Sequence, residues 1–313
     1  MFLHFKDKWT PDAVDLHHYS DDCEYWRQGV SLHVLRQNIS EEQKELVSRL
    51  EFEDGLDNFQ ELNDHKTLRC QSSVSGSEVS AQILSECLMR EATISDVDYL
   101  IYCHRGIDLE FYSSPACRAQ NALQNKKIIP FSVSQCGTSA GMYGLDLANT
   151  LAQQGQKGVV VVLSELGIMP IRRRILRDTL VNDGASVLLL NLDRSGVEIE
   201  YSDVRQFASN IDYSSDLLGA YSELLQMATD MVGSIDDALH ILPYYSRDFK
   251  EKALSVLRCG PNYLFENRDD GYSGINFPAN ALQEFIDSSA NRAIILQVSE
   301  TGAGAFIVIK KVS

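Results

Sequence analysis

The chain has 313 residues, of which 44% are hydrophobic and 23% are charged. This composition is typical of a soluble globular protein and excludes the disordered and fibrous classes, and the length indicates one large domain or two of medium size. The formal net charge of −16 argues against a nucleic-acid-binding function, because most of the surface would repel a polyanion.

The predicted elements alternate between helix and strand from about residue 76 onwards, whereas 1–75 shows no clear pattern beyond a helix predicted over 40–50. Helices are predicted at 78–90, 115–124, 217–232, 247–257 and 278–286, and a further helix of about 16 residues is predicted to end at Gly155. Strands are predicted at 97–103, 128–134, 158–163, 186–192, 197–201, 238–242, 292–298 and 305–309. The run 158–163 is apolar at every position, which indicates a central strand covered by helices on both faces.

The same order of elements occurs twice along the chain. Each half has a strand, a loop, a helix, a strand, a glycine-containing turn and a further strand. Two packed copies of one α/β unit would account for this order. We therefore predict an N-terminal half over 1–200 and a C-terminal half over 201–313.

No membrane segment, secretion signal or metal site is predicted. No apolar run approaches the ~20 residues that a membrane-spanning helix needs, and the first seven residues lack the regions of a signal peptide. The seven cysteines are scattered, which favours reduced thiols, and no pair has the CxxC spacing typical of zinc sites. We therefore expect a cytoplasmic protein.

Several segments, in their order and spacing, resemble the thiolase fold and, within it, the ketoacyl-acyl-carrier-protein synthase III branch. They are the turn from Ser134 to Gly141 before a long helix, a Val-rich strand with Ser164 and Glu165, the Asn-Asp-Gly-Ala turn at 182–185, and the Glu-Thr-Gly-Ala-Gly-Ala stretch at 300–305. The resemblance implies a duplicated five-layer α-β-α-β-α fold with mixed central sheets. It also implies a dimer, and acyl transfer through a cysteine thioester followed by decarboxylative condensation.

The nucleophile of that family lies at the N-terminus of the buried helix, where the helix dipole favours a thiolate. Counting back from Gly155 places this position at Thr138, and counting back from Gly141 places it at Ser139. Counting forward from the preceding strand places it at Cys136 or Gly137. Cys136 is therefore a candidate nucleophile or a buried apolar residue, and Thr138 is a candidate nucleophile or an N-cap residue.

The other two family positions, normally His and Asn, match Tyr244 and Tyr272. A tyrosine can donate a hydrogen bond to a carbonyl oxygen but is a poor base at neutral pH. Asn276 lies close to the second position. His104 follows a predicted strand, and because ligands gather at the carboxyl ends of strands it is a candidate base or a hydrogen-bonded loop residue.

A basic run, formed by Arg172, Arg173 and Arg174, stands out in this acidic chain. We predict that it binds the phosphate of coenzyme A or phosphopantetheine, or an acidic carrier protein; the alternative is pairing with the chain's own carboxylates. Gly302 and Gly304 complete the predicted substrate-binding set. The resemblance implies no cofactor. The acyl group is the substrate, and it arrives on coenzyme A or a carrier protein.

Two functions are compatible with these residues. The first is an acyltransferase or condensing protein that acts on acyl thioesters in specialised metabolite or fatty-acid-like biosynthesis. The second is a non-catalytic subunit that supports an active ketosynthase-like chain in a heterodimer, because all three site positions are replaced. The two differ in whether Cys136 is reactive and open to a pantetheine-sized tunnel.

Overall fold

The computed structural model describes the α/β body of the chain and a few short segments. The described residues are 2–9, 13–15, 67–69, 81, 84, 97–105, 114–123, 127–155, 158–165, 174–175, 179–181, 184–191, 196–207, 214–233, 237–245, 247–257, 262–266 and 272–312. The helix predicted over 40–50 lies outside these residues.

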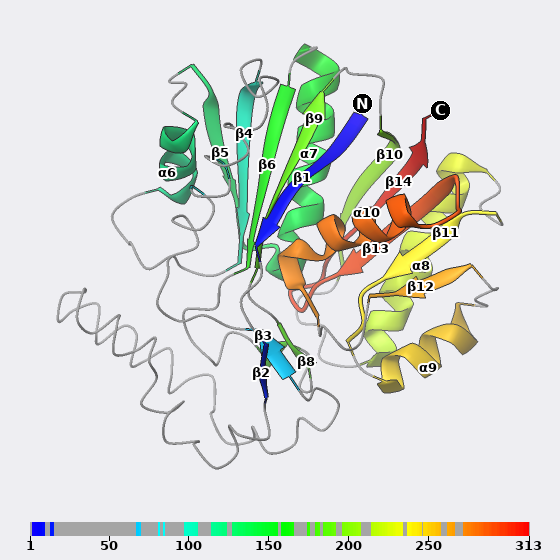
Figure 1. Ribbon diagram of the computed structural model, residues 1–313. Coiled ribbons are helices and arrows are strands. Elements are labelled where there is room, and N and C mark those ends of the chain that lie inside the picture. Colours follow the sequence, from blue (N-terminus) through cyan, green and yellow to red (C-terminus); the bar gives the residue numbers. More distant parts are fainter. Residues whose placement is uncertain are drawn as a thin grey trace.

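Ten strands form one continuous sheet, which divides into two halves of five strands each (Figure 1). The N-terminal half has the order β5 (Ile129–Val133), β4 (Val97–His104), β6 (Gly158–Glu165), β9 (Gly184–Asn191) and β1 (Phe2–Trp9). The C-terminal half has the order β12 (Tyr263–Phe265), β11 (Leu239–Leu242), β13 (Arg292–Val298), β14 (Ala303–Lys311) and β10 (Val197–Gln206). In each half the first three strands are parallel and the last two pairings are antiparallel, so the halves repeat one mixed topology.

The two halves join through a short pairing at the start of the chain. Phe2 and Leu3 of β1 pair antiparallel with Glu198 and Val197 of β10. Two small separate sheets consist of β2 (Ala13–Asp15) with β3 (Thr67–Arg69), and of β7 (Arg174–Ile175) with β8 (Thr179–Leu180).

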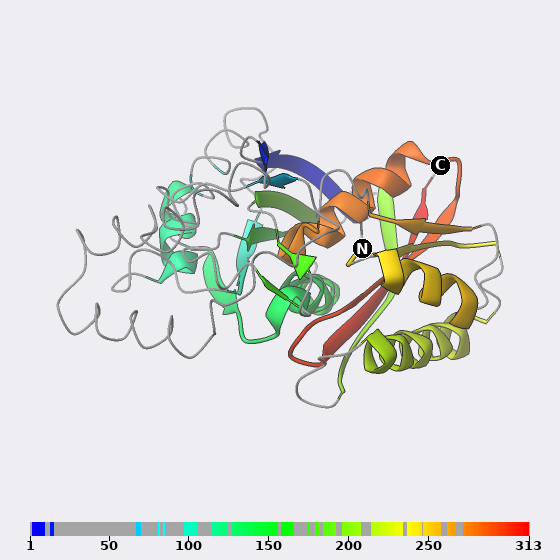
Figure 2. The same cartoon turned by 90° about the horizontal axis from the view of Figure 1, so that it is seen from below.

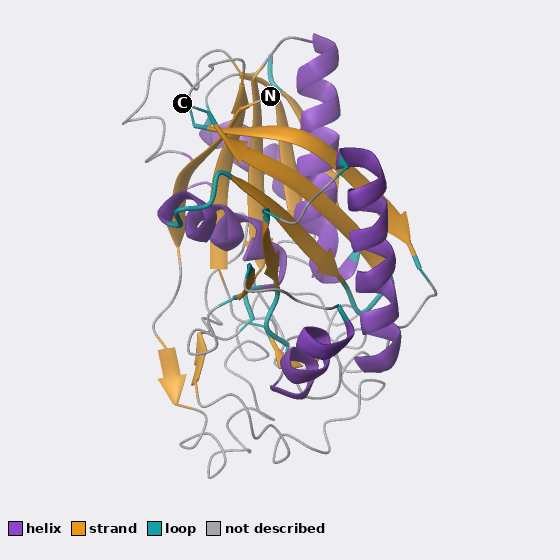
Figure 3. Cartoon of the chain, turned by 90° about the vertical axis from the view of Figure 1, so that its right-hand side faces the viewer, coloured by secondary structure: helices purple, strands orange, loops and turns teal. Residues whose placement is uncertain are grey.

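The α-helices of the described residues form three layers around the two halves. They are α6 (Pro115–Ala122), α7 (Ala140–Gly155), α8 (Ser214–Val232), α9 (Arg247–Val256) and α10 (Phe277–Asp287). Helix α7 contacts strands of both halves and also contacts α10, so these two helices form the middle layer. Helix α6 covers the outer face of the N-terminal half, and α8, with α9 against it, covers the outer face of the C-terminal half (Figures 2 and 3). The predicted five-layer α-β-α-β-α fold is therefore confirmed.

The packing of β6 explains why its residues 158–163 are all apolar. Val161 and Leu163 belong to the core that includes Leu145 of α7. Val160 and Val162 belong to a second core that they share with residues of α6. Because both faces of the strand are covered, neither face needs polar residues.

From Val97 onwards the predicted strands and helices are present, and their ends agree with the prediction to within a few residues. The exception is β10, which continues to Gln206 instead of ending near Tyr201. Its second half is polar and partly exposed, but backbone pairing with β14 as far as Ala303 keeps it extended. Of the helix predicted over 78–90, Ala81 and Leu84 are helical.

The short strand β12 and the two-stranded sheets β2–β3 and β7–β8 were not predicted from the sequence, and neither was the longer strand β1. It lies in the centre of the sheet, between β9 and β10. Three consecutive charged residues, Lys6, Asp7 and Lys8, and a register shift between Phe5 and Asp7 break the two-residue alternation that marks a strand.

The predicted boundary between the halves needs a correction. A division after residue 200 would fall inside β10, but strand pairing places all of β10 in the C-terminal half. The topology therefore divides the chain before Val197.

Candidate active site

The turn that leads into α7 brings the three candidate nucleophiles together. Gln135 and Gly137 have positive φ angles of 64° and 55°, and the short helical turn η3 (Gly137–Ser139) follows. The side chains of Thr138 and Ser139 are fully buried. The Ser139 hydroxyl donates to the carbonyl oxygen of Ala303 at 2.9 Å, so it ties the turn to the start of β14.

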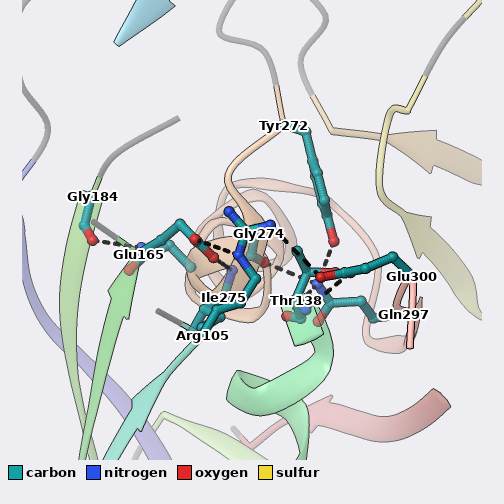
Figure 4. A network of polar contacts seen from close by, with 10 residues as sticks. Arg105, Thr138, Glu165, Gly184, Tyr272, Gly274, Ile275, Gln297 and Glu300 are labelled. Carbon is teal, nitrogen blue, oxygen red and sulfur yellow. Dashed lines mark hydrogen bonds and ion pairs between the residues drawn. The ribbon is translucent and has the colours of Figure 1, made fainter. Parts of the chain in front are cut away.

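Thr138 is bound to a carboxylate that sequence reasoning did not select. Its hydroxyl donates to Oε2 of Glu300 at 3.1 Å, and its backbone N–H donates to the same oxygen at 3.3 Å (Figure 4). Glu300 follows β13, and 25% of its side chain is exposed. The carboxylate therefore links a buried hydroxyl to the surface and could accept its proton.

Tyr272 and Gln297 complete the surroundings of Thr138. The Tyr272 side chain lies beside Thr138, and Gln297 joins the two residues. Nε2 of Gln297 donates to the Tyr272 hydroxyl at 2.7 Å and approaches the carbonyl oxygen of Thr138 at 3.0 Å and that of Gly274 at 2.9 Å. Burial raises the pKa of Tyr272 well above its usual value, so the phenol stays neutral and can donate a hydrogen bond.

Arg105 lies between two carboxylates (Figure 4). Its Nε is 3.0 Å from Oε1 of Glu165, and its terminal nitrogen is 3.7 Å from Oε1 of Glu300. Burial alone would lower the pKa of Arg105, but the two carboxylates outweigh it and the net pKa is raised. Oε2 of Glu165 in turn accepts the backbone N–H of Ile275 at 3.1 Å, in the turn η6 (Gly274–Asn276) before α10.

Cys136 lies in the same turn as Thr138 and faces a different partner. Its thiol is half-buried and approaches the carbonyl oxygen of Ser134 at 3.5 Å. Burial raises the pKa of the Cys136 thiol, which disfavours the reactive thiolate. Of these two residues, Thr138 is therefore the one whose side chain contacts a carboxylate.

The structure does not bring His104 to Thr138. His104 Nε2 lies 3.1 Å from the Ser132 hydroxyl, and the His104 ring packs 5.5 Å from that of Tyr102. Tyr102 belongs to the core on the α6 side of the sheet, whereas Cys103 belongs to the core on the α7 side. Because side chains alternate along a strand, His104 lies on the same face as Tyr102, which is the α6 side of the sheet.

Tyr244 and Asn276 are both buried. Tyr244 belongs to the same large core as Tyr272, and its neighbour Tyr245 packs its ring edge-on against that of Tyr272 at 4.9 Å. Asn276 donates from Nδ2 to the carbonyl oxygen of Gly184 at 2.8 Å, a contact that joins η6 to β9. This amide is thus already engaged in a structural contact.

The other predicted substrate-binding residues divide into two groups. Gly302 has a positive φ of 76° in the turn between β13 and β14, and a Cβ on Gly304 would lie 2.5 Å from the ring of Phe207. Both positions therefore require glycine for structural reasons. Arg172 and Arg173, and the side chain of Arg174, lie outside the described residues.

Sequence reasoning missed the charged and amide groups of this site, namely Arg105, Glu165, Gln297 and Glu300. A signal was present, because Arg105, Glu165 and Glu300 each lie at or just beyond the carboxyl end of a predicted strand, where the ligands of α/β sheets gather. The same rule selected His104, one residue before Arg105.

Among the described residues, no group of three or more His, Cys, Asp and Glu side chains is placed to hold a metal ion. No described helix is long and apolar enough to cross a membrane.

The chain was compared with known proteins by sequence and by structure. No protein-family model matches the sequence, and no curated protein matches it. Solved structures do match over the whole chain. The acyltransferase ChlB3 has 14% identity and a TM-score of 0.73, and the match covers 100% of this chain and 98% of that one.

Two further structures agree with this match. The 3-oxoacyl-[acyl-carrier-protein] synthase III from Aquifex aeolicus has 14% identity, 99% coverage of both chains and a TM-score of 0.68. OleA from Xanthomonas campestris has 13% identity, a TM-score of 0.70, and coverage of 99% of this chain and 97% of that one. The chain has the thiolase fold of ketoacyl synthase III-like proteins. Thr138 stands at the N-terminal end of the central helix of this thiolase fold, and Glu300 stands in the turn beside it.

Proposed function

We propose that the protein is an acyltransferase that acts on acyl thioesters, with Thr138 as the acyl acceptor and Glu300 as its base. The observation that carries this proposal is the hydrogen bond from the buried Thr138 hydroxyl to the Glu300 carboxylate. A hydroxyl needs an adjacent base to attack a thioester, and a carboxylate in hydrogen-bond contact meets that need.

The first step forms an ester on Thr138. The Thr138 oxygen attacks the thioester carbonyl while its proton passes to Glu300. The carbon–sulfur bond then breaks, and the sulfur takes up the proton to leave as a thiol. Tyr272, held neutral and in contact with Thr138, is placed to donate a hydrogen bond at the reacting centre.

The second step transfers the acyl group to an acceptor. A hydroxyl or amine of the acceptor attacks the Thr138 ester and gives its proton to Glu300. The Thr138 oxygen leaves and regains that proton. The products are the acylated acceptor and the free thiol, and both protein groups return to their starting state.

The acyl donor in this proposal is carried by coenzyme A or by an acyl carrier protein in the cytoplasm, and the reaction needs no other cofactor. We propose that this reaction belongs to specialised metabolite or fatty-acid-like biosynthesis.

We also propose that the protein forms a dimer. Strand β5 is the edge strand of the N-terminal half, and it exposes 51% of Ile129 and 37% of Phe131. An edge strand with exposed apolar side chains is a suitable surface for pairing with a second chain.

Intact-protein mass spectrometry tests the proposal. The purified chain is incubated with a panel of acyl-coenzyme A and acyl-carrier thioesters, together with Thr138→Val and Cys136→Ala. We expect an acyl adduct on the wild type and on Cys136→Ala, and none on Thr138→Val, which keeps the shape of the side chain without its hydroxyl. An adduct that depends on Cys136 would instead assign the displaced thiol as the acceptor.

A second candidate is the non-catalytic partner subunit. Thr138, Tyr244 and Tyr272, which the resemblance matches to the three catalytic positions of ketoacyl synthases, are all buried. The absence of an adduct with every donor, combined with co-purification of a second thiolase-fold chain, would favour this candidate.

A further inference from the structure

Gln297 is a buried amide that reaches both of the turns η3 and η6. It lies on β13, where its backbone pairs with Ala305 of β14, and its side chain is fully buried. Its Nε2 lies 3.0 Å from the carbonyl oxygen of Thr138 in η3, 2.9 Å from that of Gly274 in η6, and 2.7 Å from the hydroxyl oxygen of Tyr272 (Figure 4). These contacts place one amide between the two turns and the phenol.

The two carbonyl oxygens fix the orientation of this amide. A carbonyl oxygen only accepts hydrogen bonds, so the group that faces Thr138 and Gly274 is the NH₂ of Gln297 and not its oxygen. The amide oxygen, Oε1, is buried, and no described residue hydrogen-bonds with it. A buried polar atom without a partner lowers stability, and an apolar side chain would avoid that cost. This cost points to a role for the donor side of Gln297.

The amide nitrogen also sets the direction of a hydrogen-bond chain. An amide nitrogen donates but does not accept, so the Tyr272 oxygen accepts from Nε2 of Gln297 and the phenol proton points elsewhere. At the other end of the chain a carboxylate only accepts, because the Thr138 hydroxyl gives its proton to Glu300 at 3.1 Å and its oxygen is left to accept. Two hydroxyls held between a donor and an acceptor have one consistent order, in which the phenol donates to the Thr138 oxygen.

A second hydroxyl near Tyr272, that of Tyr245, is already engaged. Tyr245 packs its ring against that of Tyr272 and donates its proton to the carbonyl oxygen of Val298. Its oxygen lies 2.9 Å from the Tyr221 hydroxyl, which accepts the N–H of Val298 at 3.1 Å and so has its own proton for Tyr245. These contacts favour Thr138, among the described neighbours of Tyr272, as the acceptor of the phenol proton.

We propose that Gln297 is a positioning residue that holds the phenol proton of Tyr272 on the Thr138 oxygen. This inference rests on the proposed function, in which the Thr138 proton passes to Glu300 during attack on the thioester. Negative charge develops on the Thr138 oxygen at that moment, and the hydrogen bond from Tyr272 stabilises it while the phenol keeps its own proton. Gln297 acts through Tyr272 and not on the reacting atoms.

A purely structural role is the alternative, because the same amide ties η3 to η6. Gln297→Met keeps the length of the side chain but has no N–H, so the phenol proton loses its fixed direction. Gln297→Glu also keeps the shape, but it places an acceptor oxygen against Tyr272, and the phenol proton can then turn away from Thr138. Gln226→Met, at an exposed position on α8, is the matched control.

The rate of acyl-adduct formation tests the proposal. Mass spectrometry follows the adduct with acetyl-, octanoyl- and palmitoyl-coenzyme A on the wild type and on each variant, alone and combined with Tyr272→Phe. We expect Tyr272→Phe and both Gln297 variants to slow acylation roughly tenfold or more at an unchanged half-saturating donor concentration, because the lost hydrogen bond forms only in the transition state. Combined with Tyr272→Phe, the Gln297 substitutions should cause at most about a twofold further loss, since the residue through which they act is already removed.

A spectroscopic measurement gives a readout that does not depend on activity. The chain is labelled with fluorotyrosine, in which the fluorine lies beside the hydroxyl and its resonance responds to hydrogen bonding there. Tyr272→Phe assigns the signal of Tyr272. We expect both Gln297 variants to shift this signal and Gln226→Met to leave it in place. Thermal unfolding confirms that each variant is folded, and Gln297→Glu carries the test if Gln297→Met does not fold.

Two results would overturn the proposal and leave the proposed function standing. One is an equal loss of rate from the Gln297 substitutions with and without Tyr272→Phe, which would show a structural role. The other is an unshifted Tyr272 signal in a folded Gln297 variant. If the wild type forms no acyl adduct with any donor, the proposed function fails, and the Tyr272 signal then decides by itself whether Gln297 orients the phenol.

Discussion

The turns η3 and η6 occupy equivalent places in the two halves of the fold, and their backbones are nearly the same. Cys136 and Ser273, the residues before each turn, have φ and ψ of −94° and 17°, and of −90° and 2°. Each turn begins with a glycine in the left-handed region, Gly137 at φ 55° and Gly274 at φ 58°. Both turns then lead directly into a helix of the middle layer.

The two turns are also bound by carboxylates in a reciprocal manner. Glu300, from the end of β13 in the C-terminal half, accepts the N–H of Thr138 in η3. Glu165, from the end of β6 in the N-terminal half, accepts the N–H of Ile275 in η6. Arg105 contacts both carboxylates, so each half places a glutamate at the helix start of the other.

The difference between the turns lies in one side chain and in exposure. The residue that faces the carboxylate is Thr138 in η3 and Ile275 in η6. Glu300 is partly exposed, whereas Glu165 is buried. The same backbone arrangement therefore places an apolar residue beside a buried carboxylate in one half, and a hydroxyl beside a partly exposed carboxylate in the other half.

Removing the charge of each carboxylate should separate these two roles. We expect Glu165→Gln to lower the free energy of unfolding by about 3–5 kcal/mol, because it takes the closer partner from a buried guanidinium. Glu300→Gln should cost about 1 kcal/mol or less, since its ion pair is longer and partly exposed. Denaturant unfolding of both variants measures the difference, and equal losses would show that η3 and η6 are structurally alike.

Adding a methyl group to each glycine gives a second contrast of smaller size. A Cβ on Gly274 would lie 2.4 Å from Cγ1 of Val181 and 2.5 Å from Oε2 of Glu165. On Gly137 it would lie 2.9 Å from the Glu300 carboxylate, which ends a side chain that can move towards solvent. Both substitutions strain the left-handed backbone. We expect Gly274→Ala to cost about 2–4 kcal/mol and Gly137→Ala about 1–2 kcal/mol, measured by thermal unfolding.

A third contrast concerns a second carboxylate that contacts η6. Glu266 follows β12 and accepts the hydroxyl and the N–H of Ser273, while at the matching place after β5 the N-terminal half has Ser134. Burial raises the pKa of Glu266 to about 7, although its hydrogen bonds with Ser273 and Asn280 oppose the shift. The protonated form is therefore the one that the folded state favours.

The sign of the pH dependence follows from this shift. The contribution of Glu266 to stability is complete below its unfolded pKa of about 4.5 and is lost as the pH rises through about 7. Between pH 5 and pH 8 we expect Glu266→Gln to gain roughly 2 kcal/mol relative to the wild type. Glu251→Gln, at an exposed position on α9, serves as the control, and a flat difference for Glu266→Gln would contradict the assignment.

The sequence by itself determined the order of the longer strands and helices from Val97 onwards and the duplicated α/β unit, but not the short strands β7, β8 and β12. Apolar runs such as Val159 to Leu163 and the periodicity of α7 and α8 are local patterns, so one chain is enough to read them. It also indicated that the turn before α7 matters, because small residues between a strand and a helix mark that position.

Only the tertiary structure decided which groups meet at that turn. β1 escaped the sequence pattern because its charged residues and bulge hide a strand whose place is fixed by pairing with β9 and β10. His104 and Arg105 are neighbours in sequence, but the alternation of β4 carries His104 to the α6 face, and Arg105 lies beside Glu165 and Glu300. Contacts such as that of Thr138 with Glu300 join residues 162 positions apart, and no local pattern records such a distance.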